Sequence, residues 1–340
     1  MTFALLIIGT FAVSWFGVGL FRRWGLRRSL LDVPNHRSSH DQPVPRGGGV
    51  VIVILTLAGY AAACWREPGL FSWGYLAGAL LIAAISMVDD IKHVPFLIRL
   101  AVHTAAAVML IADLGAFASV DLFGPQRSIA LGAIGPPLTV LWLVWLVNAY
   151  NFMDGIDGIA GIQALAAAGM WVAVGVLFGS YGQTLMMAVL CASVIGFLVH
   201  NWHPAKIFMG DVGSAFLGFT FASTPILFSR QAADMRGSFW VLAAIVLWPF
   251  LFDSVFTLIR RALRGERVWT AHRSHLYQRL VISGMSHSSV AAIYGASASV
   301  LAAAGLAGFF FDTAALLAVA AAAVLFSGGM VAFAATRSES

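Results

Sequence analysis

Long apolar runs, separated by short polar segments, follow one another along the chain. Most are long enough for a helix to cross about 30 Å of hydrocarbon, and only the second and third are short. In lipid a backbone must satisfy its own hydrogen bonds, which favours helices. The pattern predicts an all-α polytopic membrane protein with about eleven transmembrane helices, at residues 2–21, 50–65, 73–88, 97–113, 132–149, 160–178, 183–199, 213–229, 238–259, 288–310 and 313–335.

The composition agrees with a membrane location. Apolar residues make up 60% of the 340 residues and charged residues only 10%, whereas soluble domains average about 45–50% and about 25%. We see no internal repeat and no linker, so we expect one domain over residues 1–340. Cys64 and Cys191 both lie in apolar runs and support neither a disulfide framework nor a metal cluster.

The basic residues predict the orientation. With the N-terminus outside and the C-terminus inside, the outer loops contain Arg66, Arg127, Arg230 and Arg236, and the inner loops contain the other sixteen of the 20 Lys and Arg residues. This bias follows the positive-inside rule, so the net charge of +5 reflects orientation rather than binding to nucleic acid. The residues able to do chemistry then gather in five inner segments.

The second inner segment contains Asp89 and Asp90, at the end of the third span. Two adjacent carboxylates repel each other, and the helix macrodipole disfavours negative charge at a helix C-terminus. We therefore expect a cation beside them, either Lys92 or a divalent ion, although a solvated helix end is the alternative.

The third inner segment, "NAYNFMDGIDGIAG", contains Asn148, Asn151 and Asp154 at intervals of three, followed by Asp157. On a helix this interval places the first three on one broad face. Asn and Asp oxygens suit a hard cation such as Mg²⁺, and the glycines among them permit close approach of a ligand to the backbone. An Asx/Gly turn is the alternative.

The fourth inner segment, "HNWHPAKIFMGDVGS", places Asp211 just before the eighth span. The backbone N–H groups of the following residues can bind an anion, while Asp211 is either a simple N-cap or also a metal ligand. Lys206 adds a positive charge. Asn201 and Phe208 are suited to holding a planar base.

The fifth inner segment contains His272, Arg273 and His275 in a basic loop. The positive-inside bias or attraction to lipid headgroups explains Arg260 and Arg261, but orientation in a membrane requires no histidine. The pair of histidines is not a zinc site, because no third ligand has a matching spacing. Asp253 lies within the ninth span, where a carboxylate needs a partner; either Arg260 or the edge of the site can supply one.

The first inner segment, "DVPNHRSSHDQPVPRGGG", contains His40 and Arg46. Its prolines keep the chain extended and its glycines admit close backbone approach. A structural loop and direct contact with a substrate are both consistent with this pattern.

Taken together and in this order, the five segments resemble those of the polyprenyl-phosphate N-acetylhexosamine-1-phosphate transferases, the MraY/WecA superfamily or glycosyltransferase family 4. The resemblance extends over about residues 1–280 and is closer to the WecA branch, which initiates O-antigen and other surface polysaccharides. It implies transfer of a sugar 1-phosphate from a UDP-amino sugar to undecaprenyl phosphate, with release of UMP, at the cytoplasmic face of the bacterial inner membrane. It also implies dependence on Mg²⁺, for which Mn²⁺ can substitute.

The resemblance implies a role for each matching residue. Asp211 would bind the metal with Asn151 nearby, and Asp89 and Asp90 would lie at the metal and the acceptor phosphate. The uridine pocket would be lined by Asp154, Asp157, Asn201 and Phe208, with Asn148 and Lys206 close by. His272, Arg273 and His275 would contact the diphosphate or the sugar, and His40 and Arg46 match the first-loop motif.

The donor sugar is not fixed by these motifs. The peptidoglycan branch has a denser histidine cluster than "HRSH", which disfavours a muramoyl-pentapeptide substrate and leaves UDP-GlcNAc or 6-deoxy relatives such as UDP-N-acetylfucosamine and UDP-N-acetylquinovosamine. A homodimer is compatible with the last two spans, which are rich in small residues. Two other classes remain: an intramembrane prenyltransferase, although residue 93 is His rather than the Asp of its motif, and a polytopic transporter.

Overall fold

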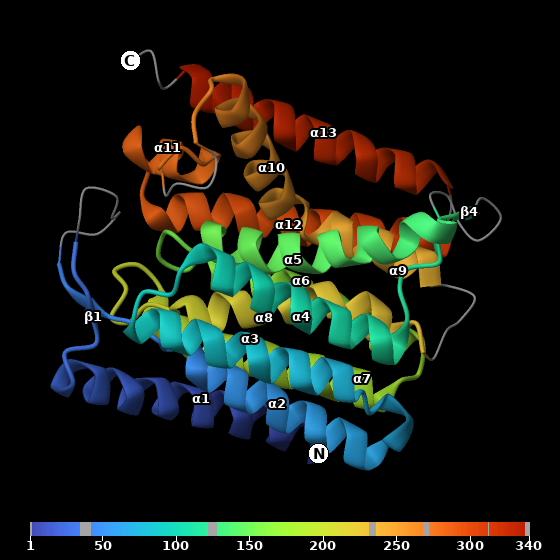
Figure 1. The fold of residues 1–340 in the computed structure, drawn as a ribbon, viewed down its shortest axis with the longest axis horizontal. Helices are drawn as coiled ribbons and strands as arrows, with labels where there is room; N and C mark the ends of the chain where they lie inside the picture. The colour runs from blue at the N-terminus through green and yellow to red at the C-terminus, as the bar shows by residue number, and fades with distance from the viewer. Residues whose placement is uncertain are drawn as a thin grey trace.

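A computed structural model describes residues 2–34, 42–121, 128–230, 236–267, 272–311 and 313–336. The chain is a bundle of helices that run roughly along one direction (Figure 1). Their bounds are α1 Thr2–Arg27, α2 Gly49–Arg66, α3 Trp73–Ile91, α4 Phe96–Leu114, α5 Gly135–Met153, α6 Ile159–Leu177, α7 Tyr181–Asn201, α8 Asp211–Phe228, α9 Arg236–Val246, α10 Trp248–Leu263, α11 Leu276–Ile282, α12 His287–Phe311 and α13 Thr313–Thr336.

The all-α, multi-pass prediction is confirmed. Within the described residues, nine helices are long and apolar enough to cross a membrane, and α9 with α10 makes a tenth if the bent pair is one span. The count of eleven and the direction of insertion stay predictions. Two short antiparallel hairpins were not predicted: β1 (Leu31–Asp32) pairs with β2 (Val44–Pro45), and β3 (Ser119–Asp121) pairs with β4 (Ser128–Ala130).

The predicted ninth span, 238–259, is wrong as a continuous helix. The chain bends by 74° between α9 and α10, and Pro249 lies in the first turn of α10. Proline has no N–H to donate and its ring clashes with the preceding turn, so the helix of α9 cannot continue through it.

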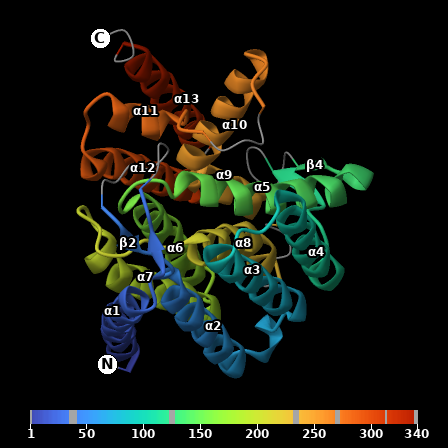
Figure 2. The ribbon, with the colours of Figure 1, turned by 60° about the vertical axis from the view of Figure 1, so that its left-hand side comes forward.

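Helix α8 is the centre of the bundle. Every residue from Val212 to Phe228 is buried, and α8 packs against α2, α3, α5 and α9. Seen 60° from the first view, α1 and α2 lie at one edge of the bundle and α10, α11 and α13 at the opposite edge (Figure 2). The first residue of this buried helix is Asp211, so the fold brings that carboxylate to the middle of one end of the bundle.

Candidate active site at one end of the bundle

The inner segments predicted from the sequence meet at the end of the bundle where α8 begins. The chain after β2 runs beside the chain before α8: Gly48 N–H donates to Phe208 O over 3.0 Å, and Phe208 N–H donates to Pro45 O over 2.8 Å. A Cβ atom on Gly49 would lie 2.4 Å from the Cα of Gly213. The first-loop glycines therefore admit another part of the protein backbone, which is the close approach that their sequence predicted.

Asp90 binds the start of α8. Its Oδ1 accepts a hydrogen bond from the backbone N–H of Asp211 over 3.0 Å, and its Oδ2 accepts one from Val212 over 3.1 Å. The N–H groups of Gly213 and Ser214 donate to Gly210 O. Asp211 is thus not a side-chain N-cap, and the anion at this helix N-terminus is Asp90 itself, because α3 and α8 pack side by side.

Arg99 is a cation beside the paired carboxylates, where the sequence predicted either Lys92 or a divalent ion. Its Nη1 binds Asp89 in a short contact and lies 3.4 Å from Asp211 Oδ2. Asp89 also accepts from Val94 N–H over 2.7 Å. The Asp89 side chain is only 6% exposed, whereas that of Asp211 is 36% exposed. Asp211 is accordingly the more accessible of these two carboxylates to a ligand.

The α5 residues reach this cluster to different degrees. Asn151 Nδ2 donates to Ser214 Oγ over 3.1 Å, one turn into α8. Asn148 points elsewhere, with Nδ2 2.7 Å from Val144 O and 3.3 Å from His103 Nδ1. Asn148 and Asn151 both belong to α5, as the spacing predicted, but their amide groups have different partners and only that of Asn151 reaches α8.

Asp154 ends α5 and is half-buried. Burial raises its pKa well above the usual value, and the negative charges of Asp211, Asp90 and Asp157 raise it further. Carboxylates from α3, the α5–α6 loop and α8 thus share one electrostatic environment. Their mutual repulsion is what a bound cation would relieve.

The glycines near Asp154 accommodate protein side chains. A Cβ on Gly155 would meet the Tyr277 hydroxyl at 2.1 Å, and one on Gly158 would meet the Trp202 ring at 3.0 Å. Asn201 holds the same turn, since its Oδ1 accepts from Gly158 N–H over 3.0 Å and its Nδ2 donates to Ile207 O over 2.9 Å. The groups that approach these glycines closely are thus protein side chains from α11 and from the end of α7, and the approach of a ligand stays a prediction.

Asp157 is buried against two histidines that the sequence did not connect to it. Its Oδ2 lies 2.6 Å from His203 Nδ1 and 3.4 Å from His287 Nδ1, and it accepts from Ala205 N–H over 3.1 Å. Burial raises the pKa of Asp157, but the hydrogen bonds from His287 and His203 outweigh it and hold the pKa below the usual value.

Asp157, His203 and His287 each offer one possible metal-ligand atom, and these three atoms lie within 4.8 Å of one another. Tetrahedral ligands of one zinc ion, however, stand about 3.3 Å apart when each bond is about 2.0–2.1 Å long. The 2.6 Å separation between His203 and Asp157 is that of a hydrogen bond. We therefore interpret the cluster as structural: it connects the α5–α6 loop to the α7–α8 loop and to the start of α12.

The histidine loop borders a small cavity of about 80 Å³ between α5 and α10, whose lining includes Asn148, Arg261, His272 and His275. His272 Nδ1 accepts from the Ser274 backbone and hydroxyl. Burial lowers the pKa of His272 to about 4, with help from the nearby His275 and Arg261. His272 is therefore neutral at pH 7 and has its proton on Nε2.

Two further features concern Arg273 in this loop and Tyr277 in α11. Arg273 Nε is buried and has no acceptor among the described residues. Tyr277 Oη donates to Phe152 O over 3.0 Å, which connects α11 to the end of α5. The loop and the carboxylate cluster thus lie on either side of the end of α5.

The other candidate residues take different positions. Lys206 is exposed, and Arg46 and Phe208 are half-buried. Arg46 lies close enough to Asp90 for its charge to act on that carboxylate. His40 lies outside the described residues.

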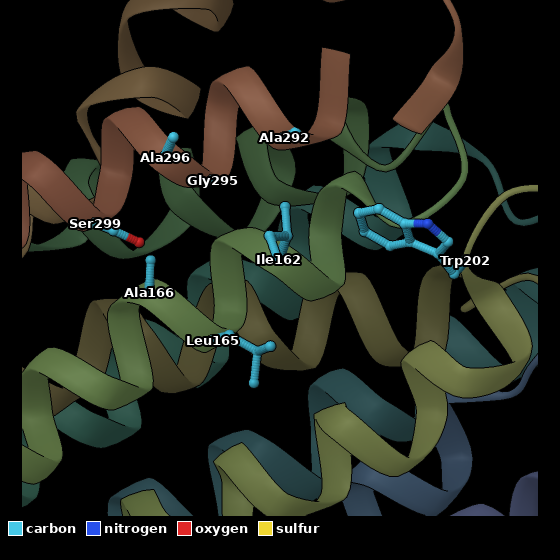
Figure 3. Close-up of a pocket in the computed structure, with 8 residues that line it drawn as sticks. All are labelled: Ile162, Leu165, Ala166, Trp202, Ala292, Gly295, Ala296 and Ser299. Atoms are coloured by element: carbon cyan, nitrogen blue, oxygen red, sulfur yellow. The ribbon is translucent and has the colours of Figure 1, made fainter. Parts of the chain in front are cut away.

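A larger hollow, of about 360 Å³, lies between α6 and α12 and is lined by Ile162, Leu165, Ala166, Trp202, Ala292, Gly295, Ala296 and Ser299 (Figure 3). Ser299 and the indole of Trp202 are its only polar side chains, and none is titratable. Its composition suits apolar contacts and not chemistry. The candidate active site is accordingly the polar end of the bundle.

Comparison with known proteins places the chain in a family. The profile of glycosyl transferase family 4 matches residues 72–229. The chain is 31% identical over 287 residues to a probable undecaprenyl-phosphate N-acetylglucosaminyl 1-phosphate transferase of Bacillus subtilis, covering 81% of this chain and 76% of that protein. The chain belongs to glycosyl transferase family 4.

Other members of family 4 align over more of the chain. A decaprenyl-phosphate N-acetylglucosaminephosphotransferase of Mycolicibacterium smegmatis is 30% identical, over 88% of this chain and 80% of that protein. An undecaprenyl-phosphate alpha-N-acetylglucosaminyl 1-phosphate transferase of Pasteurella multocida is 28% identical, over 98% of this chain and 94% of that protein. The resemblance to the polyprenyl-phosphate N-acetylhexosamine-1-phosphate transferases is thereby confirmed. The prediction that the chain is a multi-pass membrane protein is confirmed as well.

Proposed function

We propose that this family 4 protein transfers N-acetylhexosamine 1-phosphate from a UDP-amino sugar to undecaprenyl phosphate, releasing UMP. The observation that supports this most is the meeting of Asp89, Asp90, Asn151, Asp154 and Asp211 at the start of one buried helix. The names of the relatives supply the substrate classes. UDP-GlcNAc is the first donor to test, with its 6-deoxy relatives next.

The oxygen donors fit Mg²⁺, with Mn²⁺ as a substitute. Carboxylate and amide oxygens are the ligands that these hard ions prefer. Burial raises the pKa of Asp154, and the nearby charges of Asp211, Asp90 and Asp157 raise it further. Asp211 and Asn151 would hold the ion, since both oxygens of Asp90 already accept from α8. When bound, the ion would neutralise charge on the diphosphate.

The protein's own groups would bind and orient the two substrates. Arg273, with its unpartnered Nε, supplies positive charge for the diphosphate, and neutral His272 supplies an Nε2–H donor. Asp154 and Asp157, with Asn201 and Phe208, would line the uridine pocket, where Asn201 and Asp157 act mainly by fixing the surrounding loops. Lys206, Asn148, Arg46 and His40 would border the nucleotide sugar.

The reaction is one in-line displacement. An oxygen of the lipid phosphate forms a bond to the phosphorus that bears sugar O1, and the bond from that phosphorus to the bridging oxygen breaks, so the electron pair leaves with UMP. A phosphate monoester, with a second pKa of about 6, is already largely dianionic near pH 7, so positioning matters more than a base. The carboxylate oxygens of Asp89 and Asp90 already accept hydrogen bonds from backbone N–H groups. This favours direct displacement by the lipid phosphate over nucleophilic attack of an Asp carboxylate on the phosphorus.

We infer a location in the bacterial inner membrane with the site facing the cytoplasm, where UDP-sugars are available. The product would start O-antigen or another surface polysaccharide. The sixteen basic residues at the inner ends support this direction of insertion.

The test is a donor screen with purified protein in detergent, undecaprenyl phosphate and Mg²⁺. UMP release with UDP-GlcNAc or a related UDP-amino sugar, matched by a labelled lipid product, is expected. A prenyltransferase would instead consume a prenyl diphosphate, and a transporter would move solute in vesicles while the Asp211→Asn variant kept full function. Either result without UMP release overturns the proposal.

A further inference from the structure

Asp253 is a fully buried carboxylate that belongs to neither the carboxylate cluster nor the predicted metal ligands. It lies in α10, is 1% exposed, and does not pair with Arg260, whose Nη2 donates to Ser274 O instead. Its partners come from α10, α11 and α12. A buried carboxylate is costly unless donors surround it, so these partners show what holds it there.

Five donors converge on this one carboxylate. Oδ1 accepts from His275 Nδ1 over 3.1 Å, Leu276 N–H over 2.8 Å and Thr257 Oγ1 over 3.1 Å. Oδ2 accepts from Tyr277 N–H over 3.1 Å and from the Tyr294 hydroxyl over 2.6 Å. A carboxylate surrounded only by donors is held in its ionised form.

The bond to His275 fixes that ring. An ionised carboxylate offers only acceptors, so Nδ1 of His275 must bear a proton to donate to it. The other ring nitrogen, Nε2, is not used by this bond, and His275 lines the cavity shared with Asn148 and Arg261. Which nitrogen of a histidine is free for a ligand is decided by the hydrogen bond that the other one makes.

We propose that Asp253 is a positioning residue for the transfer reaction. It keeps the proton of His275 on Nδ1 and directs Nε2 at the sugar-diphosphate, and through Leu276 and Tyr277 it holds the histidine loop against the end of α5. This inference rests on the proposed function, because it assigns Nε2 of His275 to that substrate.

The test is a double-mutant cycle on UMP release at saturating substrates. Asn in place of His275 keeps a donor for Asp253 and a good N-cap for α11 but removes Nε2. Asp253→Asn and His275→Asn should each lower kcat about 10- to 100-fold, the range for outer partners that orient a functional histidine, with little change in KM for the lipid. The double variant should be no slower than the slower single variant, since both changes remove one function.

Tyr294→Phe is the matched control. It removes a donor to the same carboxylate without touching His275, so it should lower the melting temperature in detergent while kcat stays within about twofold. Equal kcat losses for Tyr294→Phe and Asp253→Asn, or losses that multiply in the double variant, would show a purely structural carboxylate and overturn the proposal.

A second measurement does not depend on activity. Nitrogen-15 spectra of the wild-type histidines, with His275 assigned by its disappearance in His275→Asn, should show a protonated Nδ1. An unprotonated Nδ1 contradicts the proposal. Wild-type protein that releases no UMP from any UDP-amino sugar, while Nδ1 is protonated, refutes the proposed function and the substrate contact but leaves the Asp253–His275 bond established.

Discussion

Asp90 at the end of α3 accepts the backbone N–H of Asp211 at the start of α8, over 3.0 Å. One carboxylate thereby fixes the position of another that is 121 residues away in the chain. The first N–H groups of a helix have no acceptor within the helix, and Asp90 satisfies two of those of α8. The second Asp of the adjacent pair is therefore the residue that places Asp211.

Asp90→Ala should destabilise the protein by about 2 kcal/mol, because buried N–H groups lose their acceptor, and it should also abolish UMP release. Ser72→Ala is the control: at the other end of α3 the Ser72 hydroxyl accepts from Tyr75 N–H and donates to Asp113 Oδ2, so its loss should also destabilise the protein by about 2 kcal/mol but should not affect turnover. Thermal unfolding in detergent and UMP release measure both. Unchanged turnover in Asp90→Ala would remove Asp90 from the site.

Arg99→Gln should lower the Mg²⁺ concentration that gives half-maximal UMP release, by about fivefold. Arg99 lies 3.4 Å from Asp211, and a partly exposed ion pair is worth about 1 kcal/mol; removing its charge makes Asp211 a better ligand for a cation. The maximal rate should fall as well, because Asp89 loses its partner. A higher Mg²⁺ requirement in the variant would show that Arg99 helps to build the cation site instead of competing with the ion.

Asp157→Asn should reduce stability near neutral pH but not in strong acid. The pKa of Asp157 is lowered in the folded protein, so its ionised form contributes stability above its usual pKa, and that contribution disappears as the pH falls through about 4 and below. The gap in melting temperature between wild type and Asp157→Asn should thus close in acid. An Asp157→Asn gap that stays constant as the pH falls would contradict the assigned interaction.

Gly49→Ala should destabilise the protein by about 1–3 kcal/mol through overpacking. Its Cβ would lie 2.4 Å from the Cα of Gly213, where backbone meets backbone and neither can move away easily. Gly9→Ala in α1 is the control, because a Cβ there meets nothing within 4 Å. Equal melting temperatures for the two variants would mean that α2 and α8 are not in this close contact.

The spans were predictable because lipid exposure imposes one simple rule on composition. The predicted 97–113 and 160–178 correspond to α4 (Phe96–Leu114) and α6 (Ile159–Leu177). Helix α1 continues to Arg27, beyond the predicted 21, since basic residues at a helix end do not stop it. Pro249 indicates the bend before α10, but hydropathy, from which the span was predicted, does not distinguish a bent helix from a straight one.

The site was predictable as a set of segments but not as a set of contacts. Residue type and position made Asp211 and Asn151 candidates, the family resemblance paired them at a metal, and the structure brings both to the start of α8. Arg99 was counted only as an orientation signal, and His287 was not connected to Asp157. Such partners depend on how helices far apart in the sequence pack, and no local pattern encodes that.

The most direct test of the central claim, that carboxylates from several helices form one cation site, is a titration with Mn²⁺ followed by electron paramagnetic resonance. Mn²⁺ prefers the same oxygen ligands as Mg²⁺, and Mn²⁺ that is not bound to protein gives a paramagnetic resonance signal that is lost on binding. Wild type and Ser72→Ala should both reduce the free signal, more strongly with UDP-GlcNAc present, and Asp211→Asn should leave it unchanged. Binding of Mn²⁺ by Asp211→Asn as strong as that of wild type would contradict the claim.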